Sequence, residues 1–112
     1  MTSEMMLRNE DKLLEVKRIL MESSMSRALE WISQRGFIEG LKYLCEQNCE
    51  NCFFIEYDNE NNSTDALRVG IIYNQLEYVK YIIDNRLMES YPYLLVICSE
   101  RNNFEIFKYL AS

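Results

Sequence analysis

The fold of this chain is decided by the segment NQLEYVKYI, residues 74–82, because two other segments match it without a gap. The matching segments are GFIEGLKYL at residues 36–44 and NNFEIFKYL at residues 102–110. Each begins with Gly or Asn, has Glu at the fourth position and ends with Lys, Tyr and either Leu or Ile. Self-similarity of this kind predicts internal repeats of one structural unit.

The apolar residues within each copy are spaced as on one face of an α-helix, at i, i+3, i+6 and i+7. In the middle copy these residues are Leu76, Val79, Ile82 and Ile83. Each copy also places a Lys three residues after a Glu, an arrangement that suits side-chain pairing and the helix dipole. The repeated segment is therefore predicted to be an amphipathic helix.

A second apolar pattern precedes each copy. The three upstream patterns cover residues 28–32, 66–72 and 94–98. Gly36, Asn74 and Asn102 lie between the two patterns of each repeat, and Gly and Asn tolerate the left-handed conformation that ends a helix. Each repeat is therefore predicted to be a helix, a tight turn and a second helix, so the chain should be all-α.

The intervals between Gly36, Asn74 and Asn102 are 38 and 28 residues, which average 33. The longer interval contains a polar run, residues 56–65, with no helical period, which predicts a loop. A further amphipathic helix at residues 9–22 echoes the repeat and should cap the first unit. The expected organisation is one domain over residues 1–112, with the cap at 9–22, repeats at 24–48, 64–86 and 91–112, and a long loop at 49–63.

The mean period and the pattern Gly/Asn-x-Leu-Glu-x-Val-Lys-Tyr-Leu/Ile resemble the ankyrin repeat over roughly residues 24–112. The Tyr-rich and Asn-rich character is similar to divergent ankyrin proteins of large DNA viruses and protists. This resemblance implies a short helical repeat solenoid that binds partner proteins. Tetratricopeptide and armadillo-like arrays also use paired amphipathic helices and remain alternatives.

The opening Thr-Pro-Leu-His box of the ankyrin family is almost lost here. The corresponding residues are Arg27-Ala28-Leu29-Glu30, Asp65-Ala66-Leu67-Arg68 and Tyr93-Leu94-Leu95-Val96. The Thr and His of that box tie neighbouring repeats together. Their loss leads us to expect plain loops in place of the finger-like turns of the family, above all across residues 49–63.

Composition and charge limit the classes of partner that we expect for this chain. The net charge of −6 argues against direct binding to nucleic acid and suits a protein partner with a basic surface. The N-terminal residues have no apolar run typical of a signal peptide or a membrane span, so we expect an intracellular, cytoplasmic protein without membrane contact.

Catalysis is not expected. The chain has no histidine, which is the commonest general base and zinc ligand, and it has no glycine-rich phosphate loop. The spacing of Cys45, Cys49 and Cys52 could hold an iron–sulfur cluster or, with Cys98, a zinc ion. Because Cys45 falls on the apolar helix face, we predict no metal and no cofactor, and a cysteine-ligated metal or redox protein is the alternative.

The predicted function is non-enzymatic binding of a partner protein through the first helices of the repeats and the loops between them. The predicted binding residues are Arg27, Glu30, Gln34, Tyr57, Asp58, Glu60, Arg68, Tyr91, Tyr93 and Arg101. A sharper alternative is a small acidic inhibitor of viral or phage origin that blocks a basic groove of a host protein.

The last helix pattern raises a separate hypothesis. Its apolar residues Phe104, Phe107 and Leu110 are not followed by a polar capping repeat. This helix either caps the stack by itself or associates with a second subunit.

Overall fold

The computed structural model describes residues 8–47, 53–56 and 63–112. A single helix, α1 (Asn9–Glu22), comes first and spans the same residues as the predicted cap. Three helix pairs follow: α2 (Met25–Arg35) with α3 (Ile38–Glu46), α4 (Ala66–Ile72) with α5 (Leu76–Asp84), and α6 (Tyr93–Arg101) with α7 (Phe104–Ala111). Apart from one short strand pair, the described chain is helical or in turns, so the all-α prediction is confirmed.

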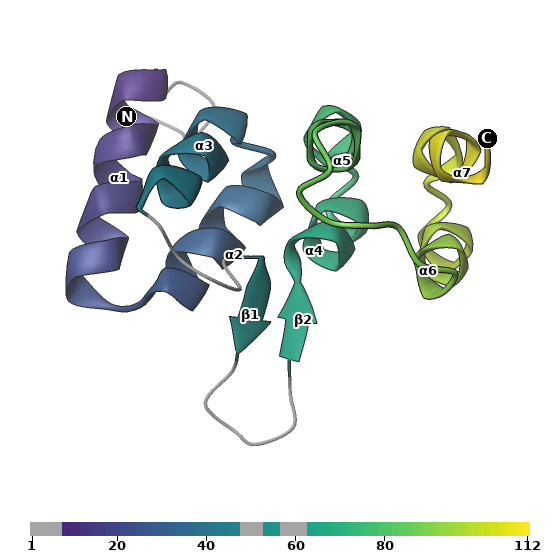
Figure 1. Cartoon of the computed structure of the whole chain (residues 1–112), viewed down its shortest axis with the longest axis horizontal. Helices are drawn as coiled ribbons and strands as arrows, with labels where there is room; N and C mark the ends of the chain where they lie inside the picture. The colour runs from purple at the N-terminus through teal and green to yellow at the C-terminus, as the bar shows by residue number, and fades with distance from the viewer. Residues whose placement is uncertain (1–7, 48–52, 57–62) are drawn as a thin grey trace.

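The helices form two rows. The first helices α2, α4 and α6 lie side by side in one row, and the second helices α3, α5 and α7 form the other (Figure 1). At the N-terminal end, α1 packs against both α2 and α3. The core lies between the rows and includes the fully buried residues Leu29, Leu41, Leu67, Val79 and Ile106.

The turns within the pairs confirm the prediction for Gly and Asn. Gly36, Asn74 and Asn102 all adopt left-handed backbone conformations, with φ of 65°, 57° and 59°. In each pair, the backbone N–H of the next residue donates to a carbonyl in the last turn of the first helix, as from Gln75 to Gly70 at 2.8 Å. This closing bond satisfies backbone groups that the helix end leaves unpaired.

Side-chain amides then tie each pair to the preceding pair. The Gln75 amide donates to the backbone carbonyl of Gln34 at 2.7 Å, and the Asn103 amide donates to the backbone carbonyl of Ile71. Gln75 and Asn103 occupy the same place in their helix pairs, directly after the left-handed residue. These bonds hold neighbouring pairs in register.

The recurring Lys and Tyr of the second helices form what we call the Lys–Tyr ladder. In each rung a lysine ammonium lies over the tyrosine ring of the next unit, within reach of a cation–π attraction. The rungs are Lys17 over Tyr43 (5.3 Å to the ring centre), Lys42 over Tyr81 (5.6 Å) and Lys80 over Tyr109 (5.8 Å). Because Lys17 belongs to α1, that helix stacks on the first pair as the second helices stack on one another.

The expectation of a plain loop across residues 49–63 is wrong in its described part. Strands β1 (Phe54–Glu56) and β2 (Ser63–Asp65) pair antiparallel, with Phe54 opposite Asp65, Ile55 opposite Thr64 and Glu56 opposite Ser63. Ile55 is buried and β1 contacts α2, so apolar burial favours the strand over a loop. The two strands project from the edge of the first-helix row, between α2 and α4 (Figure 1).

Candidate protein-binding surface

Seven of the ten predicted binding residues lie in the described chain, and the first-helix row brings six of them into two groups. We call these the N-terminal groove, which contains Arg27, Glu30 and Gln34, and the tyrosine cluster, which contains Arg68, Tyr91 and Tyr93. Arg101 is exposed in the last turn of α6, and no hydrogen bond or ion pair recorded for the described residues joins it to either group. Tyr57, Asp58 and Glu60 lie outside the described residues.

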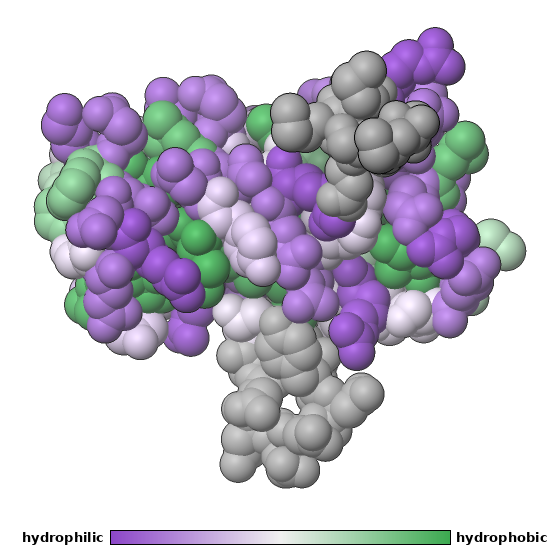
Figure 2. Space-filling view, turned by 180° about the vertical axis from the view of Figure 1, so that it is seen from behind, coloured by the Kyte–Doolittle hydropathy of each residue, from purple (hydrophilic) through white to green (hydrophobic). Residues whose placement is uncertain are grey.

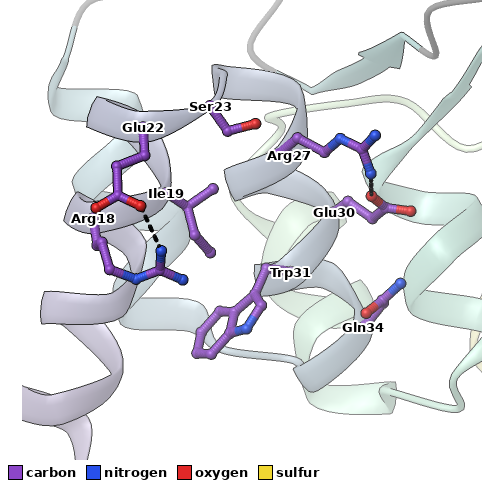
Figure 3. A pocket seen from close by; sticks show the side chains of 8 residues that line it. All are labelled: Arg18, Ile19, Glu22, Ser23, Arg27, Glu30, Trp31 and Gln34. Atoms are coloured by element: carbon purple, nitrogen blue, oxygen red, sulfur yellow. Dashed lines mark hydrogen bonds and ion pairs between the residues drawn. The ribbon is translucent and has the colours of Figure 1, made fainter.

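The N-terminal groove runs between α1 and α2 and has a volume of about 490 Å³ (Figure 3). Arg27, Glu30 and Gln34 line it from α2 because residues spaced by three and four share one face of a helix. The other lining residues are Arg18, Ile19 and Glu22 of α1, Ser23 in the turn, and Trp31 of α2.

Charged side chains of the groove pair with each other. Arg18 lies 2.8 Å from Glu22, and Arg27 lies 3.7 Å from Glu30. Arg18 also donates to Glu15, and this hydrogen bond lowers the pKa of the Glu15 carboxyl. The groove is therefore lined by neutral ion pairs beside the Trp31 ring, which carries the Arg35 guanidinium 4.2 Å from its centre.

The tyrosine cluster is built on the start of α4. Asp65 is the N-cap of that helix and accepts a hydrogen bond from the backbone N–H of Arg68 at 2.8 Å. Its second carboxylate oxygen accepts from the Tyr91 hydroxyl at 2.5 Å, and the Tyr91 oxygen in turn accepts from Nε of Arg68 at 2.9 Å. Asp65 is only 5% exposed, so a buried carboxylate anchors the connection between the second and third pairs.

The Arg68 guanidinium lies near two aromatic rings, 5.7 Å from the centre of Tyr91 and 5.2 Å from the centre of Tyr93. Tyr93 remains 49% exposed at the start of α6. Burial and the hydrogen bond to Asp65 raise the pKa of Tyr91 to about 12, so its hydroxyl stays protonated at neutral pH. The cluster thus presents a fixed arginine and an exposed tyrosine near the middle of the first-helix row.

A hollow of about 610 Å³ opens beside this cluster. Its walls come from the residue before β1, from the start of α4 and from the connection between α5 and α6. The lining residues are Phe53, Asp65, Arg68, Leu87, Met88, Glu89 and Tyr91. Apolar and charged side chains therefore face the same space, as in surfaces that bind proteins.

Sequence reasoning missed Asp65 and the apolar walls of the hollow. An Asp directly before the apolar pattern at residues 66–72 is a helix N-cap signal, and that signal could have identified Asp65 as a fixed position. Nothing in the local pattern relates Asp65 to Tyr91, which lies 26 residues further along the chain.

The cysteines do not assemble as a four-thiolate site would require. Cys45 is half-buried in α3 and Cys98 is fully buried in α6, and the pair formed by α4 and α5 lies between them (Figure 1). Burial raises the pKa of the Cys98 thiol, which makes it less reactive. Cys49 and Cys52 lie outside the described residues, and within residues 8–47, 53–56 and 63–112 no three potential ligands gather at one point.

None of the helices in the described part of the chain combines the length and the apolar character needed to cross a bilayer. Comparison of the chain with protein-family models, with curated proteins and with solved structures finds no match.

Proposed function

We propose that this chain is an ankyrin-like repeat protein that binds another protein through its first-helix row and the strand pair beside it, without catalysing a reaction. The architecture is supported by three helix pairs with left-handed turns at equivalent residues and by the rungs of the Lys–Tyr ladder. The strand pair projects from the same row as the first helices (Figure 1).

The observation that carries the binding role is the position of Arg68, which is bonded to the Tyr91 hydroxyl and lies near the Tyr93 ring. Arg and Tyr dominate binding hot spots because they bury large areas and form directed hydrogen bonds. Fixing Arg68 before binding lowers the entropy that is lost when the complex forms. Leu87 and Met88 of the adjoining hollow can contact an apolar side chain of the partner. Glu89, which also lines the hollow, favours a basic residue beside that side chain.

The proposal can be tested by photo-crosslinking in an extract of the source cells. A photoreactive phenylalanine analogue at Tyr93 should give a discrete adduct, whereas the same analogue at Glu77, on the exposed side of α5, should give none. Arg68→Ala should abolish the Tyr93 adduct without changing the helical circular dichroism. Equal adducts from Tyr93 and Glu77 would contradict a specific first-helix surface.

Salt dependence tests the basic character of the partner. A basic partner surface should lose affinity steeply as ionic strength rises, because screening weakens the attraction to a chain of charge −6. An affinity that is independent of salt would instead indicate an interface dominated by apolar contacts.

A further inference from the structure

The connection between α5 and α6 contains backbone groups that form no recorded hydrogen bond within the described chain. These are the N–H and C=O groups of Glu89 and Ser90, and both residues are exposed. Residues 89–91 run without helix, turn or bend, and Tyr91 precedes Pro92, a position that favours an extended backbone. The connection crosses from the second-helix row to the first-helix row (Figure 1). It therefore presents an extended backbone that a second chain can reach.

Two hollows flank this segment. The hollow beside the tyrosine cluster, of about 610 Å³, is lined by Tyr91 but not by Ser90. A second hollow, of about 470 Å³, is lined by Ser90 but not by Tyr91. Its other lining residues are Ile83, Arg86, Met88 and Glu89. Neighbouring side chains of the segment therefore point into different hollows, as side chains alternate along a β-strand.

The backbone groups of Ser90 point away from α6. The Tyr91 carbonyl accepts a hydrogen bond from the backbone N–H of Leu94 at 3.0 Å, so it faces the start of α6. Along an extended segment, the backbone groups of successive residues point to opposite edges, which directs those of Ser90 to the other edge. A residue of a second chain can exchange two hydrogen bonds with Ser90 there, as in antiparallel strands.

The side chains around the two hollows favour particular residues of an added strand. Phe53, Leu87 and Met88 give the first hollow apolar walls. Glu89 is two residues from Tyr91 and so lies on the same side of the segment, where it favours a basic residue. At the second hollow, Arg86 is exposed and has no ion pair recorded within the described residues, so a carboxylate suits this side.

Pairing through the backbone does not require a broad apolar surface. On the face shown in Figure 2, hydrophobic surface lies toward both ends of the rows and the middle is mainly hydrophilic. An added strand pairs polar backbone groups and buries only the side chains that enter the hollows.

We propose that an extended segment of the partner protein adds as a strand to residues 89–91, with alternate side chains entering the two hollows. The segment carries an apolar and a basic residue two positions apart on one face, with an acidic residue between them that pairs with Arg86. This inference rests on the binding role proposed for the first-helix row and specifies the chemistry of the partner.

A phage-displayed library of random octapeptides, selected on the immobilised chain, tests the proposal. Enriched peptides should share an acidic residue between an apolar and a basic one. When an enriched peptide is resynthesised with one N-methyl group at each position in turn, binding should be lost only at alternate positions, because alternate N–H groups face the neighbouring strand. A selection that enriches no sequence would overturn strand addition, and so would sensitive positions spaced by three or four, as in a bound helix.

Variants of the connection test the site. Ser90→Pro removes a backbone donor and should raise the dissociation constant of an enriched peptide about tenfold, whereas Ser90→Ala keeps the donor and should bind like the unaltered chain. Arg86 has φ of 58°, which glycine adopts without strain, so Arg86→Gly should lose binding without loss of fold. This variant should no longer distinguish the peptide from an analogue with Asn at the acidic position. Equal binding by Ser90→Pro and Ser90→Ala would contradict the pairing.

The Tyr93 crosslink separates this inference from the proposed function. Ser90→Pro should abolish the Tyr93 adduct in the cell extract, and Ser90→Ala should keep it. An adduct that survives in Ser90→Pro would overturn strand addition while the first-helix surface remains a binding site. Absence of the adduct in the unaltered chain would instead contradict the proposed function. Self-association that Ser90→Pro abolishes in sedimentation velocity would assign the added strand to a second copy and overturn the choice of a partner protein.

Discussion

The Tyr91 hydroxyl donates a 2.5 Å hydrogen bond to the buried carboxylate of Asp65, joining the connection before α6 to the start of α4. This bond fixes the exposed Tyr93 two residues later, because the chain between them is short and contains Pro92. The most distinctive part of the candidate surface therefore depends on one buried acid that bonds to the neighbouring helix pair.

The pKa of Tyr91 predicts alkaline destabilisation. Its value of about 12 exceeds the ordinary value of 10.0, so the folded state favours the protonated phenol. The stability that this group contributes is fully present below pH 10 and is lost as the pH rises toward 12. Denaturant unfolding across this range should show a steeper loss for the unaltered chain than for Tyr91→Phe, and identical slopes would contradict the assignment.

Asp65→Ala should destabilise the fold by more than the loss of an ordinary N-cap. Removing such a cap costs about 1 kcal/mol, and the change also leaves the Tyr91 hydroxyl without its acceptor. Ser24 caps α2 in the same way, accepting from the backbone N–H of Arg27 at 3.1 Å. Urea denaturation of Ser24→Ala is therefore the matched control. Equal losses in the two variants would show that the Asp65–Tyr91 bond contributes nothing.

Gln75→Ala should lower the free energy of unfolding by about 1 kcal/mol, the usual net value of one hydrogen bond. The lost bond is the 2.7 Å contact from the Gln75 amide to the backbone carbonyl of Gln34. Gln34→Ala keeps that carbonyl and serves as the control, with an expected change close to zero. If both variants lost the same stability in chemical denaturation, the amide tie between the pairs would be unimportant.

Arg86→Gly should stabilise the protein. Arg86 has φ of 58°, a left-handed conformation that costs a residue with a side chain about 1 kcal/mol relative to glycine. Thermal unfolding should show a higher midpoint for this variant. Glu46→Gly, at an exposed helical position, should show a lower midpoint, since glycine destabilises helices where φ is negative.

The second helices and their turns could be predicted from sequence because a 3.6-residue period and the conformational freedom of Gly and Asn are local properties. Gly36, Asn74 and Asn102 illustrate this. Arg86 shows the limit, because its left-handed conformation is imposed by the end of α5 and not by the residue type. The strands escaped prediction because three residues are too few to display a period.

The candidate surface likewise has one part that local sequence patterns could predict and one part that they could not. Arg27, Glu30 and Gln34 could be grouped from their spacing on one helix, and the structure places them together. The tyrosine cluster needed tertiary information, since Asp65 and Arg68 lie at the start of the second helix pair, whereas Tyr91 lies at the start of the third. Local patterns identified Arg68 and Tyr91 separately, but only the packing of the second and third pairs brings them into one hydrogen-bonded group.

The two connections between helix pairs differ in length, and this difference limits the positions in which a chain could bind along the first-helix row. A strictly periodic row of helices offers a bound chain several equivalent registers, displaced by one repeat. Here the strand pair joins the first and second pairs, whereas the shorter connection after Arg86 leaves the hollow beside Arg68 and Tyr91. A bound chain that fills this hollow can lie on the row in only one register. The unequal spacing of the helix pairs would therefore fix both the position and the orientation of such a chain.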